Sequence, residues 1–155
     1  GVTLVQIQRL VANTMVKSTH LKDLKMIEAM CLALTIYYEA RSEPVMGQYK
    51  VAEVVMNRVK SDKYPNTICG VMEHDTGSLK DDCQFSFYCD GKPEKPAEEI
   101  PWLFAQIIAY DVIEHGVQDN TGATHYHATY SKPYWRNKLK YLYQIGRHKF
   151  YKEVR

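Results

Sequence analysis

The stretch LTIYYEARSEP, residues 34–44, determines how the first half of this chain is interpreted. Its apolar start changes abruptly to Glu39, Arg41 and Glu43, and Pro44 closes it. A carboxyl group at the end of a largely buried helix loses hydration, which favours the neutral acid and raises its pKa. Glu39 is therefore a candidate proton donor near neutral pH. The alternative is an ordinary helix end, at which Glu39 pairs with Arg41 or caps the backbone.

Helical patterns both precede and follow the change from apolar to charged residues at Glu39. Residues 24–38 have apolar side chains at helical spacing, and the second half of the segment is apolar nearly all round. This pattern is typical of a central helix that other elements cover. A second helix is expected over residues 47–60, with Glu53 on its outward face. A third is expected over residues 99–114, stopped by Gly116.

Short strands are expected in the second half of the chain. The sequence CQFSFYCDG, residues 83–91, alternates polar and aromatic residues and ends in an Asp-Gly turn signal, which predicts a hairpin. The tail YQIGRHKFY, residues 143–151, predicts a last strand interrupted at Gly146. Helices first and short strands later predict one α+β domain.

The sequence ATHYHATY, residues 123–130, predicts a strand with His125 and His127 on one face and Tyr126 on the other. Two histidines on one strand face form half of a zinc site. The candidates for a third ligand are His74, His115, His148 and Glu39. No ligand at a fixed spacing supports this, so the histidines are interpreted as part of a polar groove without metal.

The four cysteines do not indicate whether the chain works in an oxidising or a reducing compartment. Cys31 lies in the apolar helical pattern and is expected to be a buried free thiol. Cys69, Cys83 and Cys89 lie near turns, where one disulfide can form and its pairing cannot be deduced.

Composition and charge limit the functional classes. The 155 residues are 45% apolar, which suffices for one core, and a net charge of +2 gives no general case for nucleic acid. From residue 131 to 155, however, the sequence contains eight Lys or Arg residues, and Glu153 is the single acidic residue. Such a stretch is either a surface for an anionic polymer or lipid, or a solvated face. No stretch approaches the roughly 20 apolar residues of a membrane span.

Four ordered blocks resemble the SleB/CwlJ-type cell-wall hydrolases, the family of spore cortex-lytic enzymes with bacteriophage relatives. The blocks are TIYYEARSEPVMGQYKVAEVVMNRV, YPNTICGVM, CQFSFYCDG and ATHYHATYSKPYW…IGRHKFY, from about residue 34 to 151. The resemblance implies a single lysozyme-like catalytic domain over residues 1–155, with residues 1–23 as a helical extension. It also implies a lytic transglycosylase or muramidase that cleaves the MurNAc-β-1,4-GlcNAc bond without a cofactor. Glu39, the glutamate of the YxEAR block, would be its single general acid/base.

The expected cleft wall follows from motif membership and strand alternation, because aromatic faces and amides suit sugar rings. Its candidates are Tyr38, Glu43, Gln84, Phe85, Ser86, Asp90, His125, Tyr126, His127 and Trp135. Family members commonly have glycine at the positions of Tyr38 and Ser42, and tryptophan at that of Phe87, which puts the cleft shape in question. If the reaction is hydrolysis, Glu43 or Asp90 would supply the second carboxylate.

Two rival functions come from other classes. A zinc amidase or peptidase would use His125 and His127 as ligands and Glu39 as base, and would be sensitive to EDTA. A non-catalytic wall-binding module would not clear a suspension of walls. For the transglycosylase the expected partner is peptidoglycan glycan strands, bound by a monomer at the cell wall, in the periplasm, spore cortex or outside the cell; the amidase or peptidase would act on the peptide stems. The N-terminus lacks a signal peptide pattern, which favours a phage-encoded, virion-associated or excised domain.

Overall fold

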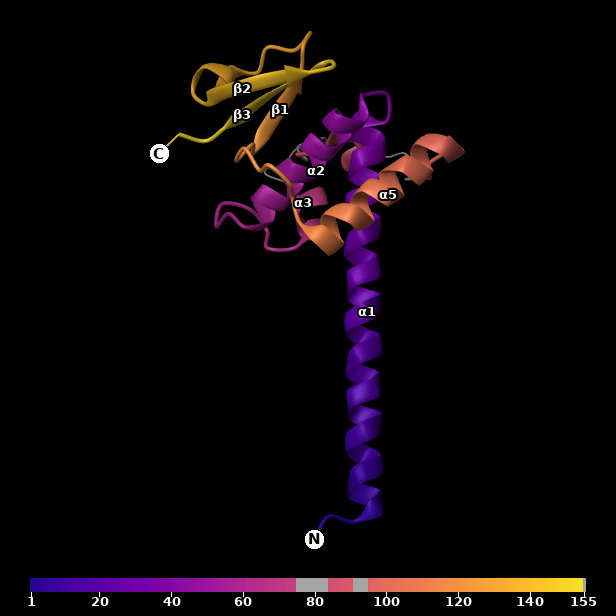
Figure 1. The fold of residues 1–155 in the computed structure, drawn as a ribbon. Helices are drawn as coiled ribbons and strands as arrows, with labels where there is room; N and C mark the ends of the chain where they lie inside the picture. Colours follow the sequence, from indigo (N-terminus) through magenta and orange to yellow (C-terminus); the bar gives the residue numbers. More distant parts are fainter. Residues whose placement is uncertain (75–83, 91–94, 155) are drawn as a thin grey trace.

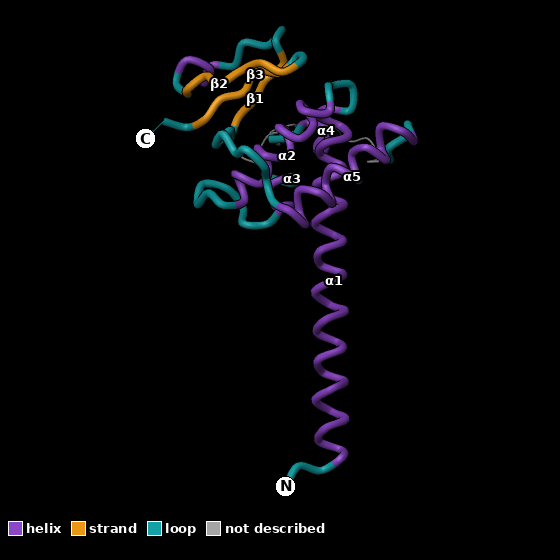
Figure 2. The backbone as a smooth tube through the Cα atoms, viewed as in Figure 1, coloured by secondary structure: helices purple, strands orange, loops and turns teal. Residues whose placement is uncertain are grey.

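The computed structural model describes residues 1–74, 84–90 and 95–154, with the backbone alone described at residues 14–19. A helical lobe surrounds one end of a long helix, and a small sheet lies beside this lobe (Figures 1 and 2). The elements are α1 (Leu4–Ala40), α2 (Val45–Val59), α3 (Ile68–Met72), α4 (Ser86–Cys89), α5 (Glu99–His115), β1 (His125–Ala128), the 3-10 helix η1 (Tyr134–Asn137), β2 (Lys140–Ile145) and β3 (His148–Lys152). The α+β fold class is confirmed.

Helix α1 contains the expected central helix and begins much earlier, at Leu4. A capping box starts it, because the Thr3 hydroxyl accepts from the Gln6 N–H and the Gln6 side chain accepts from the Thr3 N–H. Its N-terminal half projects from the lobe (Figure 1), while Leu32 and Ile36 in the C-terminal half are fully buried. Among the described residues, no helix is both long and apolar enough to cross a membrane.

Helix α2 packs on α1, and its Val51, Val54 and Val55 are fully buried. Val55 joins the core cluster of α1, whereas Val51 and Val54 pack with Ala40 and with Phe150 of β3. The expected outward position of Glu53 is wrong, because only 1% of this residue is exposed. Its carboxylate accepts from the Lys50 ammonium at 2.9 Å and from the Thr121 hydroxyl at 2.7 Å. The segment that leads into β1 therefore covers this face of α2, a contact that helical periodicity cannot reveal.

The three strands form an antiparallel sheet in the order β1-β3-β2. The tail is thus two strands that turn at Gly146, rather than one interrupted strand. Gly146 has a φ of +56°, and a Cβ there would lie 2.8 Å from a Glu43 carboxylate oxygen, so this turn requires glycine. Tyr126 pairs with Phe150 in register and packs towards the helices, whereas His127 is on the opposite face of the sheet, as predicted.

The hairpin expected at residues 83–91 is wrong within the part that the structure describes. Residues Ser86–Cys89 form the single turn α4, while Cys83 and Gly91 lie outside the described residues. Phe85 and Phe87 are buried, and the Phe87 ring stacks on Tyr38 with centroids 5.0 Å apart. Burial of every second residue over so short a segment fits one helical turn as well as a strand, so the alternation was ambiguous.

The expected free thiol at Cys31 is also wrong, because Cys31 forms a disulfide with Cys69. The Glu28 carboxylate accepts from the Ile68 and Cys69 N–H groups at 2.5 and 3.2 Å, which holds the start of α3 against α1. This docking brings the two cysteines together. Cys89 is disulfide-bonded as well.

Candidate active site

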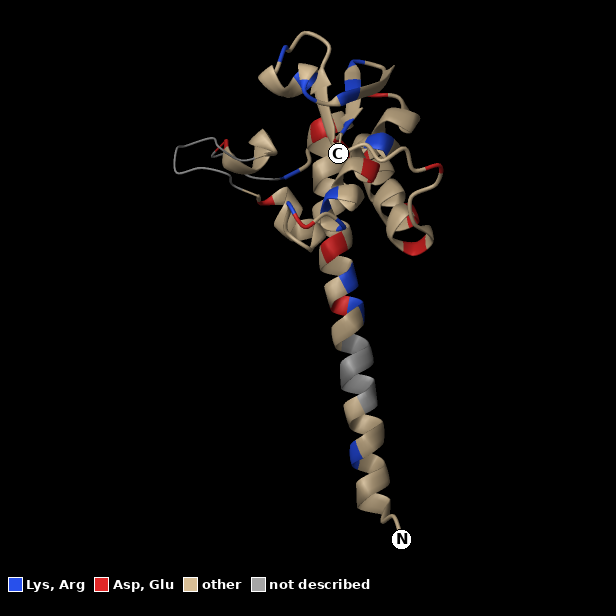
Figure 3. Cartoon of the chain, turned by 90° about the vertical axis from the view of Figure 1, so that its left-hand side faces the viewer, with Lys and Arg blue, Asp and Glu red and all other residues tan. Residues whose placement is uncertain are grey.

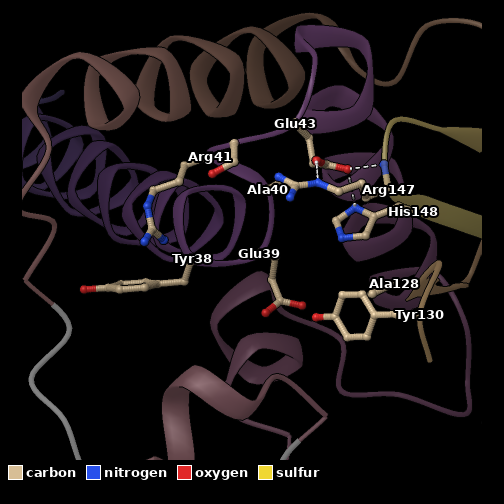
Figure 4. A pocket seen from close by; sticks show the side chains of 10 residues that line it. Tyr38, Glu39, Ala40, Arg41, Glu43, Ala128, Tyr130, Arg147 and His148 are labelled. Atoms are coloured by element: carbon tan, nitrogen blue, oxygen red, sulfur yellow. Dashed lines mark hydrogen bonds and ion pairs between the residues drawn. The ribbon is translucent and has the colours of Figure 1, made fainter.

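Glu39 lies in the last turn of α1, at a pocket of about 240 Å³ between this helix end and the sheet (Figure 4). Tyr126, from the helix-facing side of β1, donates its hydroxyl hydrogen bond to Glu39 Oε1. The pocket is lined by Tyr38, Glu39, Ala40, Arg41, Ser42, Glu43, Ala128, Tyr130, Arg147 and His148. The end of a buried helix thus meets a strand that begins 85 residues later in the sequence.

Burial dominates the ionisation of Glu39. It raises the pKa of the carboxyl group, while the Tyr126 hydrogen bond and the positive charge of Arg58 oppose that rise. The residue as a whole keeps some exposure at the pocket. Burial and the adjacent Glu39 also raise the pKa of Tyr126 well above its ordinary value, so its hydroxyl remains a donor. Glu39 is therefore a carboxylic acid that is neutral more readily than usual and still reachable from the pocket.

Arg58 supplies a buried positive charge near this pair. Its Nε donates to the Thr124 carbonyl at 2.8 Å, and its guanidinium lies over the rings of Tyr64 and Phe85 at 4.9 and 5.5 Å. Burial lowers its pKa, but an arginine remains charged in proteins. A fixed cation near Glu39 favours the carboxylate after a proton has left.

Glu43 anchors the opposite wall of the pocket. Its side chain is 6% exposed, and its carboxylate accepts from the Arg147 backbone N–H at 2.7 Å and from Arg147 Nε at 3.4 Å. His148 Nδ1 lies 3.8 Å from the same group. These contacts, drawn as dashed lines in Figure 4, fix the β2–β3 turn against the corner between α1 and α2.

The residues expected in the cleft wall fall into three places, of which the first is the pocket itself. Tyr38 and Glu43 line it, and Tyr126 contacts Glu39. A second group lies around Arg58: Gln84 Oε1 accepts from Arg58 Nη1 at 3.4 Å, and Phe85 is buried beneath the guanidinium. The nearby residues Ser86 and Asp90 are exposed on and just after α4.

The third group lies on the face of the sheet opposite Tyr126. There Trp135 packs against His125 and His127, with ring centroids 5.1 and 5.6 Å apart, and also against Tyr151. His127 Nε2 lies 2.9 Å from the Tyr151 hydroxyl. Burial, aided by Arg58, lowers the pKa of His125 to about 4. These side chains are not brought into the pocket with Glu39, and no group of three metal-ligating side chains forms among the described residues.

Several residues that line the pocket are absent from the expected cleft wall, among them Tyr130, Arg147 and His148. Tyr130 lies in the turn just after β1, beyond the reach of strand alternation. Arg147 and His148 follow the Gly146 turn, and only the tertiary contact with Glu43 brings them to the pocket.

Replacing Tyr126 with phenylalanine tests the electrostatics of the site. The hydrogen bond from Tyr126 lowers the pKa of Glu39 against the larger effect of burial, so its removal should raise that pKa further. If Glu39 must be protonated to act, activity falls as pH rises through its pKa. We therefore expect the alkaline limb of the pH–rate profile to move to higher pH in the variant, with a lower maximum. A limb that stays in place or moves to lower pH would contradict this assignment.

A protein-family model described as Cell Wall Hydrolase matches residues 42–151, beginning just after Glu39. The spore cortex-lytic enzyme of Halalkalibacterium halodurans is 30% identical over 123 residues, which are 77% of this chain and 33% of that protein. The spore cortex-lytic enzyme of Bacillus cereus is 49% identical over 41 residues, which are 26% of this chain and 16% of that protein. The chain therefore spans a third or less of the length of these relatives.

Two solved structures share the fold over most of the chain. The catalytic domain of the germination-specific lytic transglycosylase SleB from Bacillus anthracis is 30% identical, with a TM-score of 0.64, and the alignment covers 81% of this chain and 93% of that one. The catalytic domain of the Bacillus cereus SleB protein is 30% identical as well, with a TM-score of 0.63 and coverages of 81% and 89%.

Proposed function

The chain belongs to the cell wall hydrolase family, and we propose that it degrades peptidoglycan as a lytic transglycosylase, cleaving the MurNAc-β-1,4-GlcNAc bond with Glu39 as its single general acid/base. The observation that carries the proposal is the Glu39–Tyr126 pair: an acid whose pKa is raised by burial, in a pocket, held by one hydroxyl donor. The likeness to the catalytic domain of a lytic transglycosylase supports the same reaction class.

In this reaction Glu39 first acts as an acid. Its proton passes to the glycosidic oxygen as the C1–O bond breaks and positive charge develops on the sugar ring. The resulting carboxylate is stabilised by the Tyr126 hydroxyl and by Arg58. The C6 hydroxyl of the same sugar then attacks C1, and Glu39 takes up its proton. The products are a 1,6-anhydro end and a free hydroxyl on the leaving sugar.

One carboxylate suffices for this sequence, because the nucleophile is tethered to the sugar and no water has to be ordered. Simple hydrolysis would need a second carboxylate as nucleophile or base. Glu43 is the acidic group that shares the pocket, and its oxygens already accept from the Arg147 backbone and side chain. This engagement favours the transglycosylase over the hydrolase.

A turbidity assay tests the proposed function. The purified chain should clear a suspension of purified peptidoglycan at neutral pH, and it should do so in the presence of EDTA. Failure to clear walls would favour a wall-binding module, while loss of clearing with EDTA that Zn²⁺ restores would favour the amidase alternative.

The place of action follows from the same proposal. Peptidoglycan lies in the bacterial wall and spore cortex, and the relatives described above are spore cortex-lytic enzymes of bacteria. These relatives give no support to a phage origin.

The basic C-terminal stretch is proposed to hold the protein on an anionic envelope. Lys and Arg recur along the strands (blue in Figure 3), and Lys138, Lys140 and Lys149 belong to this part of the chain. Changing these three lysines to glutamine should weaken binding to intact walls at low salt, with the difference fading as ionic strength rises, because exposed charges act over about 8–10 Å at moderate salt. The matched control changes the same lysines to arginine and should bind like the parent. Equal wall binding by the glutamine variant at every salt concentration would assign these lysines to a solvated face.

A further inference from the structure

The wall of the Glu39 pocket carries a guanidinium that the proposed chemistry does not use. Arg147 lines the pocket, and 68% of its side chain is exposed. Among the residues that the structure describes, Glu43 is the one acidic side chain paired with it, through Nε at 3.4 Å. Figure 4 shows the guanidinium lying between Glu43 and the space above Glu39.

The backbone at Arg147 is firmly placed. Its N–H donates to Glu43 at 2.7 Å, its carbonyl accepts from the Thr129 N–H at 2.9 Å, and Gly146 makes the tight turn before it. The strong contact of Glu43 is therefore with the backbone, and the side-chain contact is longer. A guanidinium has five N–H donors, so most of this donor set is available for another acceptor.

The other arginine of the pocket is more fully engaged. Arg41 Nε donates to Glu98 at 3.2 Å, and its guanidinium lies over the Tyr37 ring at 5.0 Å. Both contacts turn it towards α5 and the core.

The charge of the pocket favours an anion. Burial raises the pKa of Glu39 and lowers that of His148, so both side chains tend towards their neutral forms. The charged groups that remain in the lining are Arg41, Arg147 and Glu43. Because Arg41 is paired with Glu98, an incoming carboxylate would meet the exposed Arg147 guanidinium, and arginine is the side chain best shaped to bind a carboxylate through two parallel hydrogen bonds.

We propose that Arg147 is a binding residue for a carboxylate carried by the sugar in the Glu39 pocket, so that the chain selects acidic over neutral glycan. The inference rests on the proposed function for the identity of that glycan. In peptidoglycan a carboxylate can come from the lactyl group of muramic acid whose peptide has been removed, or from the peptide stem. Both sources present the same chemistry to the guanidinium.

The test measures binding in a background that does not cleave. Isothermal titration calorimetry measures the affinity of four proteins for three soluble glycan fragments. The first protein carries Glu39→Gln alone, and the other three add Arg147→Gln, Arg147→Lys or Arg9→Gln to it. One fragment has free lactyl carboxylates, one has intact stems, and one has its carboxyl groups converted to amides. Arg9→Gln is the matched control, because Arg9 is exposed on the projecting half of α1 and the charge change is identical.

Arg147→Gln should weaken binding of a carboxylate-bearing fragment about 10- to 100-fold, the usual effect of losing hydrogen bonds to a charged group. Binding of the amidated fragment should change less than about twofold, and Arg147→Lys should retain part of the affinity as a point charge. The fragment that shows the larger loss identifies the source of the carboxylate.

Equal affinities of the Arg147→Gln and Arg9→Gln proteins for all three fragments would overturn the inference, as would equal losses on acidic and amidated fragments. Thermal unfolding of each variant distinguishes lost binding from lost folding, and the lysine variant repeats the test with the backbone contact intact. Cleavage of walls by the parent protein is scored separately. If the parent fails to cleave while Arg147 still discriminates carboxylates, the binding site stands and the proposed function fails.

Discussion

Glu39→Gln protein is expected to fold normally and to lose peptidoglycan cleavage by at least about 10²–10⁴-fold, because one group serves as acid and then as base. Glutamine keeps the size of the side chain and can accept the Tyr126 hydrogen bond, but it cannot donate a proton as an acid. The measurement is the initial rate of release of soluble glycan from purified walls. Glu73→Gln, at an exposed carboxylate just after α3, is the matched control and should retain the parent rate.

The same variant has a stability signature. Because burial raises the pKa of Glu39 in the folded state, the folded chain binds more protons than the unfolded chain between the two pKa values, and stability falls as pH rises through that window. Above the window the parent carries the full cost of a buried carboxylate, and Glu39→Gln protein does not. The variant should therefore be at least as stable as the parent at neutral pH. A folded variant with nearly parental activity would remove Glu39 from the mechanism.

Removal of the Cys31–Cys69 disulfide is expected to cost about 2–4 kcal/mol of unfolding free energy, because the bond closes a loop with a sequence separation of 38. The double variant Cys31→Ala/Cys69→Ala should unfold at lower urea concentration in equilibrium denaturation. Below its unfolding transition it should still cleave walls, since the bond joins α1 to α3 away from the residues that line the pocket. If the urea midpoint and the slope of the unfolding curve were unchanged, the contacts of Glu28 with α3 would be enough to stabilise this part of the fold without the disulfide.

The ends of the helices and the faces of the strands could be predicted from the local sequence, because they depend on residues close together in the chain. The end of α1 at Ala40 could be expected, because the apolar run stops in charged residues and Pro44 follows. The end of α5 at His115 could be expected from Gly116, which has a φ of +78°. The opposite faces of Tyr126 and His127 follow from strand alternation alone.

Contacts between segments that are distant in the sequence could not be predicted from local patterns. Glu53 is polar, and its burial depends on Thr121, which lies on a different segment of the chain. The pairing of Cys31 with Cys69 depends on how α3 docks. The division of the candidate cleft residues among the pocket, the surroundings of Arg58 and the outer face of the sheet depends on how the elements pack, which strand alternation does not determine.

The candidate active site could also be predicted only in part from the sequence. Glu39 could be proposed from its position at the end of a buried helix, whereas Tyr126 and the far wall of the pocket come from the C-terminal part of the chain. Arg147 lies in the turn and His148 begins β3, and local signals do not reveal that the contact of this turn with Glu43 brings both residues to the pocket.

Mass spectrometry of the products released from purified peptidoglycan tests the central claim most directly. A transglycosylase that uses Glu39 alone yields fragments ending in 1,6-anhydro-N-acetylmuramic acid with intact peptide stems, and Glu39→Gln protein yields none. Fragments with ordinary reducing ends would instead indicate hydrolysis with a second carboxylate, and glycan strands stripped of their peptides would indicate an amidase. Either product would contradict the account.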